Sequence, residues 1–99
     1  MADEGKPAKN RVPFTKAVQV SAGGSFAGTG IDIGGGGIGV LLPKEFKTGD
    51  ALTVAVDGGP PAAPGTVRWC RAEGGSWKVG IQIGAEHWAA LAQFAGVPA

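Results

Sequence analysis

The feature that most constrains the fold is a strict alternation of apolar residues with polar or small ones. The alternation is clearest from Trp77 to Ile83, where every second residue is apolar and the residues between them are polar or glycine. A period of two places all the apolar side chains on one face of an extended strand. The segment is therefore predicted to be a β-strand with one face buried in a core.

The same alternation returns in short segments along most of the chain. These segments cover residues 15–20, 26–33, 38–42, 52–56, 67–69 and 77–83. Glycine and proline are frequent between them, with 19 and 7 copies, and the run Glu73-Gly74-Gly75 is typical of a hairpin turn. Six short strands with regular turn signals predict an all-β fold, and closure into an antiparallel barrel would leave no exposed sheet edge.

Within residues 26–33 the alternation also predicts which side chains face the core. Ala27, Thr29, Ile31 and Ile33 fall on one side of the strand, and the small residues Gly28 and Gly30 fall on the other side. We therefore expect these four residues to share a face.

The end of the chain has a different period. Trp88, Leu91 and Ala95 recur at the spacing of one helix face, and Gly96 followed by Pro98 is a helix stop signal. We expect a short C-terminal helix that packs on the barrel. The domain is then predicted over residues 13–97, and the polar residues 1–12 are expected to form a flexible N-terminal arm.

Charge and cysteine content restrict the classes of partner. The net charge is +1, so no large basic surface exists for a long nucleic acid, although a small dianionic ligand needs only a few local cations. The lone cysteine, Cys70, cannot form an internal disulfide, and no segment is long and apolar enough to enter a membrane. We expect a soluble cytoplasmic protein without membrane insertion.

No catalytic or metal-binding set emerges from the residues. The run from Gly34 to Gly39 contains a GxGxxG pattern, but a strand and Pro43 follow it instead of the helix that a dinucleotide site needs. His87, the single histidine, has no acidic or cysteine partners at ligand spacing. The chain is predicted to be neither an enzyme nor a metalloprotein and to carry no resident cofactor.

Several segments in a fixed order carry a resemblance to a known family. They are Arg11-Val12-Pro13-Phe14, then residues 30–43, 49–52 and 65–68, and finally residues 78–83. From Arg11 to Ala95 this order resembles the PilZ domain family. The resemblance implies a six-stranded PilZ-type β-barrel with a C-terminal helix, and it implies cyclic di-GMP as the possible ligand.

Many members of the family bind cyclic di-GMP through an RxxxR motif before the first strand and a [D/N]xSxxG motif after the second. Carried onto this chain, Arg11 matches the second arginine, and Asp32 and Gly37 match the ends of the second motif. Pro7 stands where the first arginine belongs and Gly34 where the serine belongs. The resemblance thus implies a ligand site made of Lys6, Lys9, Arg11, Asp32, Gly34 and Gly37, with the lysines supplying charge but no planar fork.

Two functions remain open at this point. The first is a stand-alone signalling adapter that binds cyclic di-GMP and relays it to an unidentified protein partner. The alternative is a divergent domain that does not bind the nucleotide and regulates motility or surface structures through protein interactions, with Trp69 or Trp88 as a possible anchor. A third possibility, a barrel that binds single-stranded nucleic acid, is disfavoured by the near-zero net charge.

Overall fold

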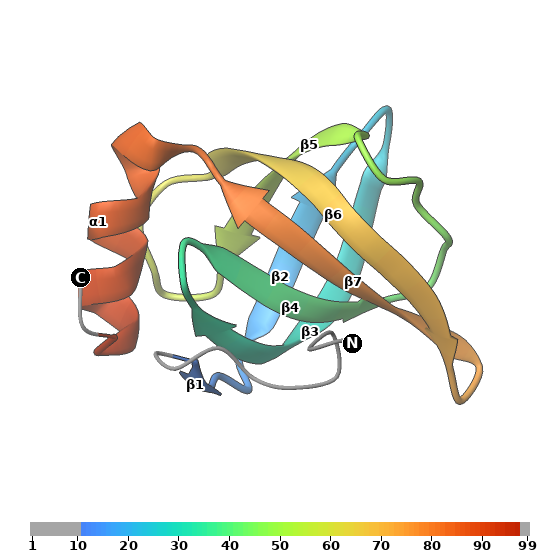
Figure 1. Cartoon of the computed structure of the whole chain (residues 1–99), viewed down its shortest axis with the longest axis horizontal. Coiled ribbons are helices and arrows are strands. Elements are labelled where there is room, and N and C mark those ends of the chain that lie inside the picture. Colours follow the sequence, from blue (N-terminus) through green and yellow to red (C-terminus); the bar gives the residue numbers. More distant parts are fainter. Residues whose placement is uncertain (1–10, 98–99) are drawn as a thin grey trace.

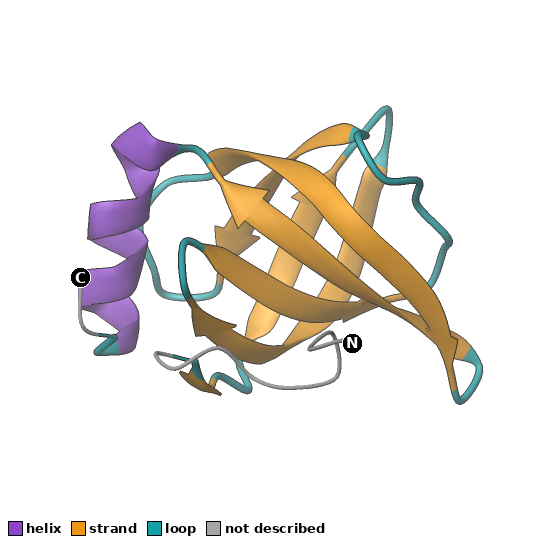
Figure 2. Cartoon of the chain, viewed as in Figure 1, coloured by secondary structure: helices purple, strands orange, loops and turns teal. Residues whose placement is uncertain are grey.

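The computed structural model describes residues 11–97, which form a barrel closed at one end by a helix (Figures 1 and 2). The strands are β1 (Val12–Pro13), β2 (Ala17–Ser21), β3 (Ser25–Gly34), β4 (Gly37–Leu42), β5 (Ala51–Val56), β6 (Ala63–Glu73) and β7 (Ser76–Ile83), and the helix is α1 (Ala85–Ala95). All pairings are antiparallel, in the order β3-β2-β5-β6-β7-β4, and the β3–β4 pairing closes the ring. The predicted six-stranded β-barrel with a C-terminal helix is confirmed.

The barrel interior is filled by branched aliphatic side chains from each of the strands β2 to β7. Val20, Val40, Val67 and Val79 are completely buried, as is Ile33. The four valines belong to alternating segments, so in β2, β4, β6 and β7 the period of two read from the sequence does correspond to the core face. Removal of this apolar surface from water is the main force that closes the barrel.

One face assignment is wrong, because β3 contains a bulge that the alternation does not reveal. Gly30 pairs with Val40 but Asp32 pairs with Gly39, so Ile31 is an extra residue on β3. Ala27 and Thr29, which precede the bulge, are exposed, while Ile33 beyond it is buried. An inserted residue reverses the facing of every side chain after it, so the four residues predicted to share a face do not do so.

A second bulge lies in β6. Val67 pairs with Ile81 and Trp69 pairs with Gly80, which leaves Arg68 as the extra residue. Val67 is buried, whereas Arg68 and Trp69, its successors, are both exposed. The bulge therefore presents two large neighbouring side chains on the outside of the barrel.

The turn and helix signals behave as predicted. Gly74 and Gly75 have φ angles of 56° and 89°, as the two central residues of a two-residue hairpin turn between Glu73 and Ser76 require. The helix ends at Gly96, which adopts the left-handed conformation with φ of 77°. Leu91 is buried and Trp88 packs partly buried against the barrel core, so α1 covers one end of the barrel.

Two strand segments were not predicted. β6 begins at Ala63, although Pro64 interrupts the strand signal in the sequence. Pro64 is the second residue of the strand and is exposed to solvent, which is where a strand tolerates proline. β1 is only two residues long and pairs with β3 through Val12 opposite Ile33. The predicted arm of residues 1–12 lies outside the described residues except for Arg11 and Val12.

Candidate functional site

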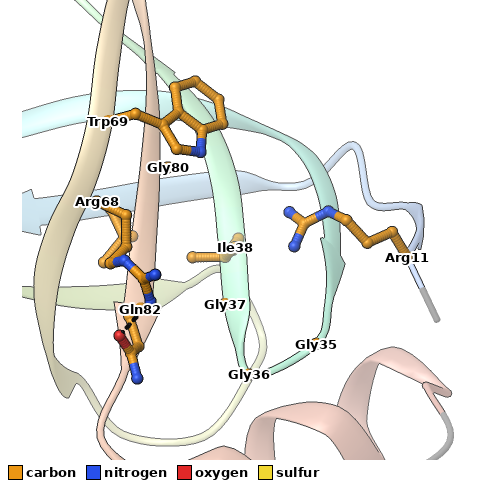
Figure 3. A pocket seen from close by; sticks show the side chains of 10 residues that line it. Arg11, Gly35, Gly36, Gly37, Ile38, Arg68, Trp69, Gly80 and Gln82 are labelled. Atoms are coloured by element: carbon orange, nitrogen blue, oxygen red, sulfur yellow. Dashed lines mark hydrogen bonds between the residues drawn. The ribbon is translucent and has the colours of Figure 1, made fainter. Parts of the chain in front are cut away.

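A cavity of about 270 Å³ opens on the outer wall of the barrel, over β4, β6 and β7. It is lined by Arg11, Gly35, Gly36, Gly37, Ile38, Arg68, Trp69, Gly80, Ile81 and Gln82. Figure 3 shows Arg11 on one side of the cavity, Arg68 and Trp69 on the opposite side, and the glycine turn below. Of the residues predicted for the ligand site, Arg11 and Gly37 line this cavity directly.

Arg11 is held at the rim by two hydrogen bonds. Pairing of β1 with β3 places Pro13 opposite Asp32, and this register brings the Arg11 side chain back along β3. Its Nη2 donates to Asp32 Oδ1 at 2.6 Å and its Nη1 donates to the Gly34 carbonyl at 2.7 Å. The two ion-paired side chains are 19% and 29% exposed, so the charge-assisted contact is partly shielded from water.

Asp32 and Gly34 both bind the Arg11 guanidinium. Asp32 does not line the cavity; its carboxylate orients the guanidinium that does. Gly34, at the position where the family motif has serine, contributes its backbone carbonyl to the same guanidinium. Both residues therefore act on the cavity through Arg11.

The glycine run forms a tight hairpin turn between β3 and β4. Gly35 and Gly36 have φ of 63° and 85°, and the flanking Gly34 and Gly37 pair with each other. Positive φ at both central residues is the requirement of the turn that joins two antiparallel strands by two residues, and glycine meets it without steric cost. The run is therefore a turn whose backbone forms one rim of the cavity.

Gly80, for which the sequence predicted no role in the site, lines the cavity, and Gly39 lies beside it on the neighbouring strand. Trp69, Gly80, Gly39 and Asp32 lie opposite one another in successive strand pairs and make one row across β6, β7, β4 and β3. The Trp69 indole lies directly on Gly80, where a Cβ atom would overlap its ring. A Cβ on Gly39 would come within 2.5 Å of Asp32 Oδ1. The two glycines thus let the Trp69 indole and the Asp32 carboxylate lie close against the strands.

The cavity wall opposite Arg11 is made of residues that the sequence did not predict for the ligand site. Arg68 donates from Nη1 to Gln82 Oε1 at 2.6 Å, and the adjacent Trp69 is 40% exposed. The only sequence signal for this wall is Gly80, because glycine inside a strand often marks the close approach of another group. Two guanidinium groups and an indole around one cavity suit an anionic ligand that carries an aromatic ring and several hydrogen-bond acceptors.

The remaining candidates lie elsewhere. Lys6 and Lys9, as well as Pro7, fall outside the described residues. His87 lines a separate cavity of about 290 Å³ between β5, the loop before β6 and α1. Cys70 is a free, half-buried thiol whose Sγ accepts from the Phe46 backbone N–H at 3.4 Å.

Two kinds of feature are absent from residues 11–97. No group of three or more histidine, cysteine or acidic side chains in this part of the chain is arranged to hold a metal ion. In the same residues, no helix has the length and apolar character needed to cross a membrane.

Comparison with known proteins gives one match. The sequence matches the model of the PilZ domain over residues 8–95, which includes Arg11, both bulges, the glycine turn and α1. No curated protein matches the chain significantly.

Proposed function

The chain belongs to the PilZ domain family, and from this premise we propose that it is a signalling adapter that binds cyclic di-GMP in the cavity beside Arg11. The family consists of binding and adapter domains, so the proposed activity is ligand-dependent protein interaction without catalysis. The proposal also places the protein in the cytoplasm, where its single cysteine, a free thiol, would stay reduced.

The observation that carries the proposal is the fixed orientation of Arg11 across from Trp69. Asp32 and Gly34 hold the Arg11 guanidinium at the rim before any ligand arrives. A guanidinium can engage phosphate oxygens, or the O6 and N7 atoms of guanine, with two parallel hydrogen bonds. Because the group is already oriented, less side-chain entropy is lost on binding.

The cavity wall opposite Arg11, made of Arg68 and Trp69, is where a guanine base of the ligand would stack. The indole of Trp69 packs on Gly80 and is 40% exposed, and the Arg71 guanidinium lies over its ring, so a base stacks on the indole when Arg71 moves aside. Arg68, tied to Gln82, adds a second guanidinium beside it. Stacking of a nucleobase on an aromatic side chain is worth about 1–3 kcal/mol.

The contacts of Arg68 and Trp69 can offset the affinity lost at the two positions, Pro7 and Gly34, where the chain departs from the family motifs. A missing arginine fork at Pro7 costs about 1–3 kcal/mol, and a missing serine hydroxyl at Gly34 costs about 0.5–1.5 kcal/mol. The stack on Trp69 is of the same order as either loss. We therefore expect the described wall of Arg68 and Trp69 to sustain an affinity in the micromolar range.

The second candidate function is the nucleotide-independent interaction regulator. It is favoured by the exposure of Trp69, because tryptophan and arginine are the residues that most often dominate protein interfaces. In this case the cavity would hold a side chain of the partner instead of a nucleotide.

Isothermal titration of the full chain with cyclic di-GMP, at an ionic strength of about 0.15 M, separates the two candidates. Micromolar or tighter binding that Arg11→Ala abolishes supports the first candidate. The matched control is Lys47→Ala, which removes one exposed cation from a loop that does not line the cavity. Absence of heat and of competition at high ligand concentration would leave the interaction regulator.

A further inference from the structure

The outer face of the β6–β7 hairpin carries two cations directly opposite each other. Arg71 on β6 pairs with Lys78 on β7, in the row next to Trp69 and Gly80. Like charges in directly opposed positions of an antiparallel pair destabilise it. No carboxylate within residues 11–97 forms an ion pair with either side chain. The described fold does not compensate this repulsion.

An exposed aromatic side chain adjoins the charged pair. The Arg71 guanidinium lies over the Trp69 ring, 5.2 Å from its centroid, and Trp69 is the exposed large hydrophobic residue of the described chain. Arg68, at the bulge, extends the same outer face. We call Arg68, Trp69, Arg71 and Lys78 the hairpin patch. The nearest acidic residue on the hairpin is Glu73, beside its turn, so cations dominate the patch.

The ligand cavity does not account for the whole patch. Arg68 and Trp69 line it, but Arg71 and Lys78 do not. Figure 1 shows the β6–β7 hairpin extending beyond the barrel, at the end away from α1. Arg71, which is exposed, and Lys78, which is half-buried, pair near the turn of this hairpin, and neither lines the proposed nucleotide site.

We propose that the hairpin patch docks an acidic segment of the protein partner through Arg71 and Lys78, the two cations of the patch that do not line the nucleotide cavity. This inference rests on the proposed adapter function and deepens it by naming the chemistry of the partner. Opposed residues of an antiparallel pair are about 5 Å apart, and alternate residues of an extended strand are separated by about 7 Å. Two carboxylates at alternate positions of an extended partner segment can thus meet Arg71 and Lys78 together.

The test uses the ¹⁵N-labelled full chain and a synthetic peptide of alternating glutamate and serine residues, followed by NMR. We expect shifts concentrated on the amides of Arg71 and Lys78 and on the Trp69 indole N–H, and none with the glutamine counterpart of the peptide. Lys78→Gln should weaken binding by about two- to fivefold, the size of one surface charge contact, and should reduce its dependence on salt. The matched variant Lys16→Gln removes a cation near α1 and should leave binding unchanged.

Three results would overturn the docking site. The first is equal weakening by Lys16→Gln, which would indicate non-specific charge attraction. The second is tighter binding to a single-stranded oligonucleotide or to anionic phosphatidylserine vesicles, which would indicate another class of partner. The third is loss of cyclic di-GMP affinity in Lys78→Gln, which would make the patch part of the nucleotide site.

The same samples separate this inference from the proposed function. Titration of the wild-type chain with cyclic di-GMP tests the nucleotide site without the peptide. Nucleotide binding without peptide binding would refute the docking site alone. Peptide binding without nucleotide binding would refute the nucleotide function and support docking at the patch.

Discussion

Arg11 and Asp32, which are 21 residues apart in the chain, are joined by an ion pair of 2.6 Å between Nη2 and Oδ1. The pair fastens the start of the described chain to β3 and aims the guanidinium at the cavity. Because the second nitrogen, Nη1, binds the Gly34 carbonyl, the planar group is fixed at two points. Both the ligand affinity and the local stability of this edge should depend on that geometry.

Arg11→Lys should reduce the affinity for cyclic di-GMP by about 10- to 100-fold, although the charge is kept. A lysine ammonium cannot span Asp32 and the Gly34 carbonyl while presenting a planar fork to the ligand, and a fork to guanine is worth about 1–3 kcal/mol. The measurement is calorimetric titration beside the wild-type chain. Wild-type affinity in this variant would show that charge alone suffices at residue 11.

Arg11→Ala and Asp32→Ala should be non-additive in their effect on the free energy of unfolding. Partly exposed ion pairs contribute about 1 kcal/mol or less, and this pair, at 19% and 29% exposure, should lie near the top of that range. A double-mutant cycle in urea gives the coupling energy. Strictly additive losses would mean that the ion pair orients Arg11 without stabilising the fold.

Gly80→Ala should displace the Trp69 indole from the cavity wall. The added Cβ would overlap the indole ring, and Trp69 is exposed enough to swing outward with little loss of core packing. We expect at least a tenfold loss of ligand affinity from the lost stack and a change in tryptophan fluorescence. Trp69→Phe in the same background identifies the emitting residue, since Trp77 and Trp88 also contribute.

If Gly80→Ala left both the fluorescence and the affinity unchanged, the indole would not be seated on β7. The comparison variant is Gly23→Ala, a glycine in another turn with nothing within 4 Å of its added Cβ. It should leave the affinity for cyclic di-GMP unaltered, whatever its effect on stability.

Gly36→Ala should destabilise the fold by about 1–2 kcal/mol, because L-residues other than glycine pay that cost at positive φ. The φ of Gly36 is 85°, and no atom lies within 4 Å of the added Cβ, so the loss is a backbone effect alone. Gly36→Asn should lose less, since asparagine tolerates the left-handed region better. Equal urea midpoints for the two variants would contradict this explanation.

The barrel itself could be predicted from the residues alone. Alternation at Trp77–Ile83 and in five other segments gives strands with one buried face, and the glycine pairs between them give hairpins; both are local properties of the chain. The helix stop at Gly96 is local as well. Arg11 and Asp32 were found through the family motif, which also depends only on sequence order.

The outer wall of the cavity could not be predicted in this way. Arg68 and Trp69 both face outward toward the cavity because Arg68 is an extra residue on β6, between the pairs that Val67 and Trp69 form with β7. In the same way, Ile31 is an extra residue on β3, and the strand beyond it turns Asp32 outward toward Arg11. A bulge depends on the register against the neighbouring strand, which the alternation within one strand does not contain. The sequence by itself therefore determined the six barrel strands, their turns and the apolar stripes that fill the core outside the bulges. The tertiary structure decided which side chains meet Arg11, because cross-strand register sets the direction of every side chain after a bulge.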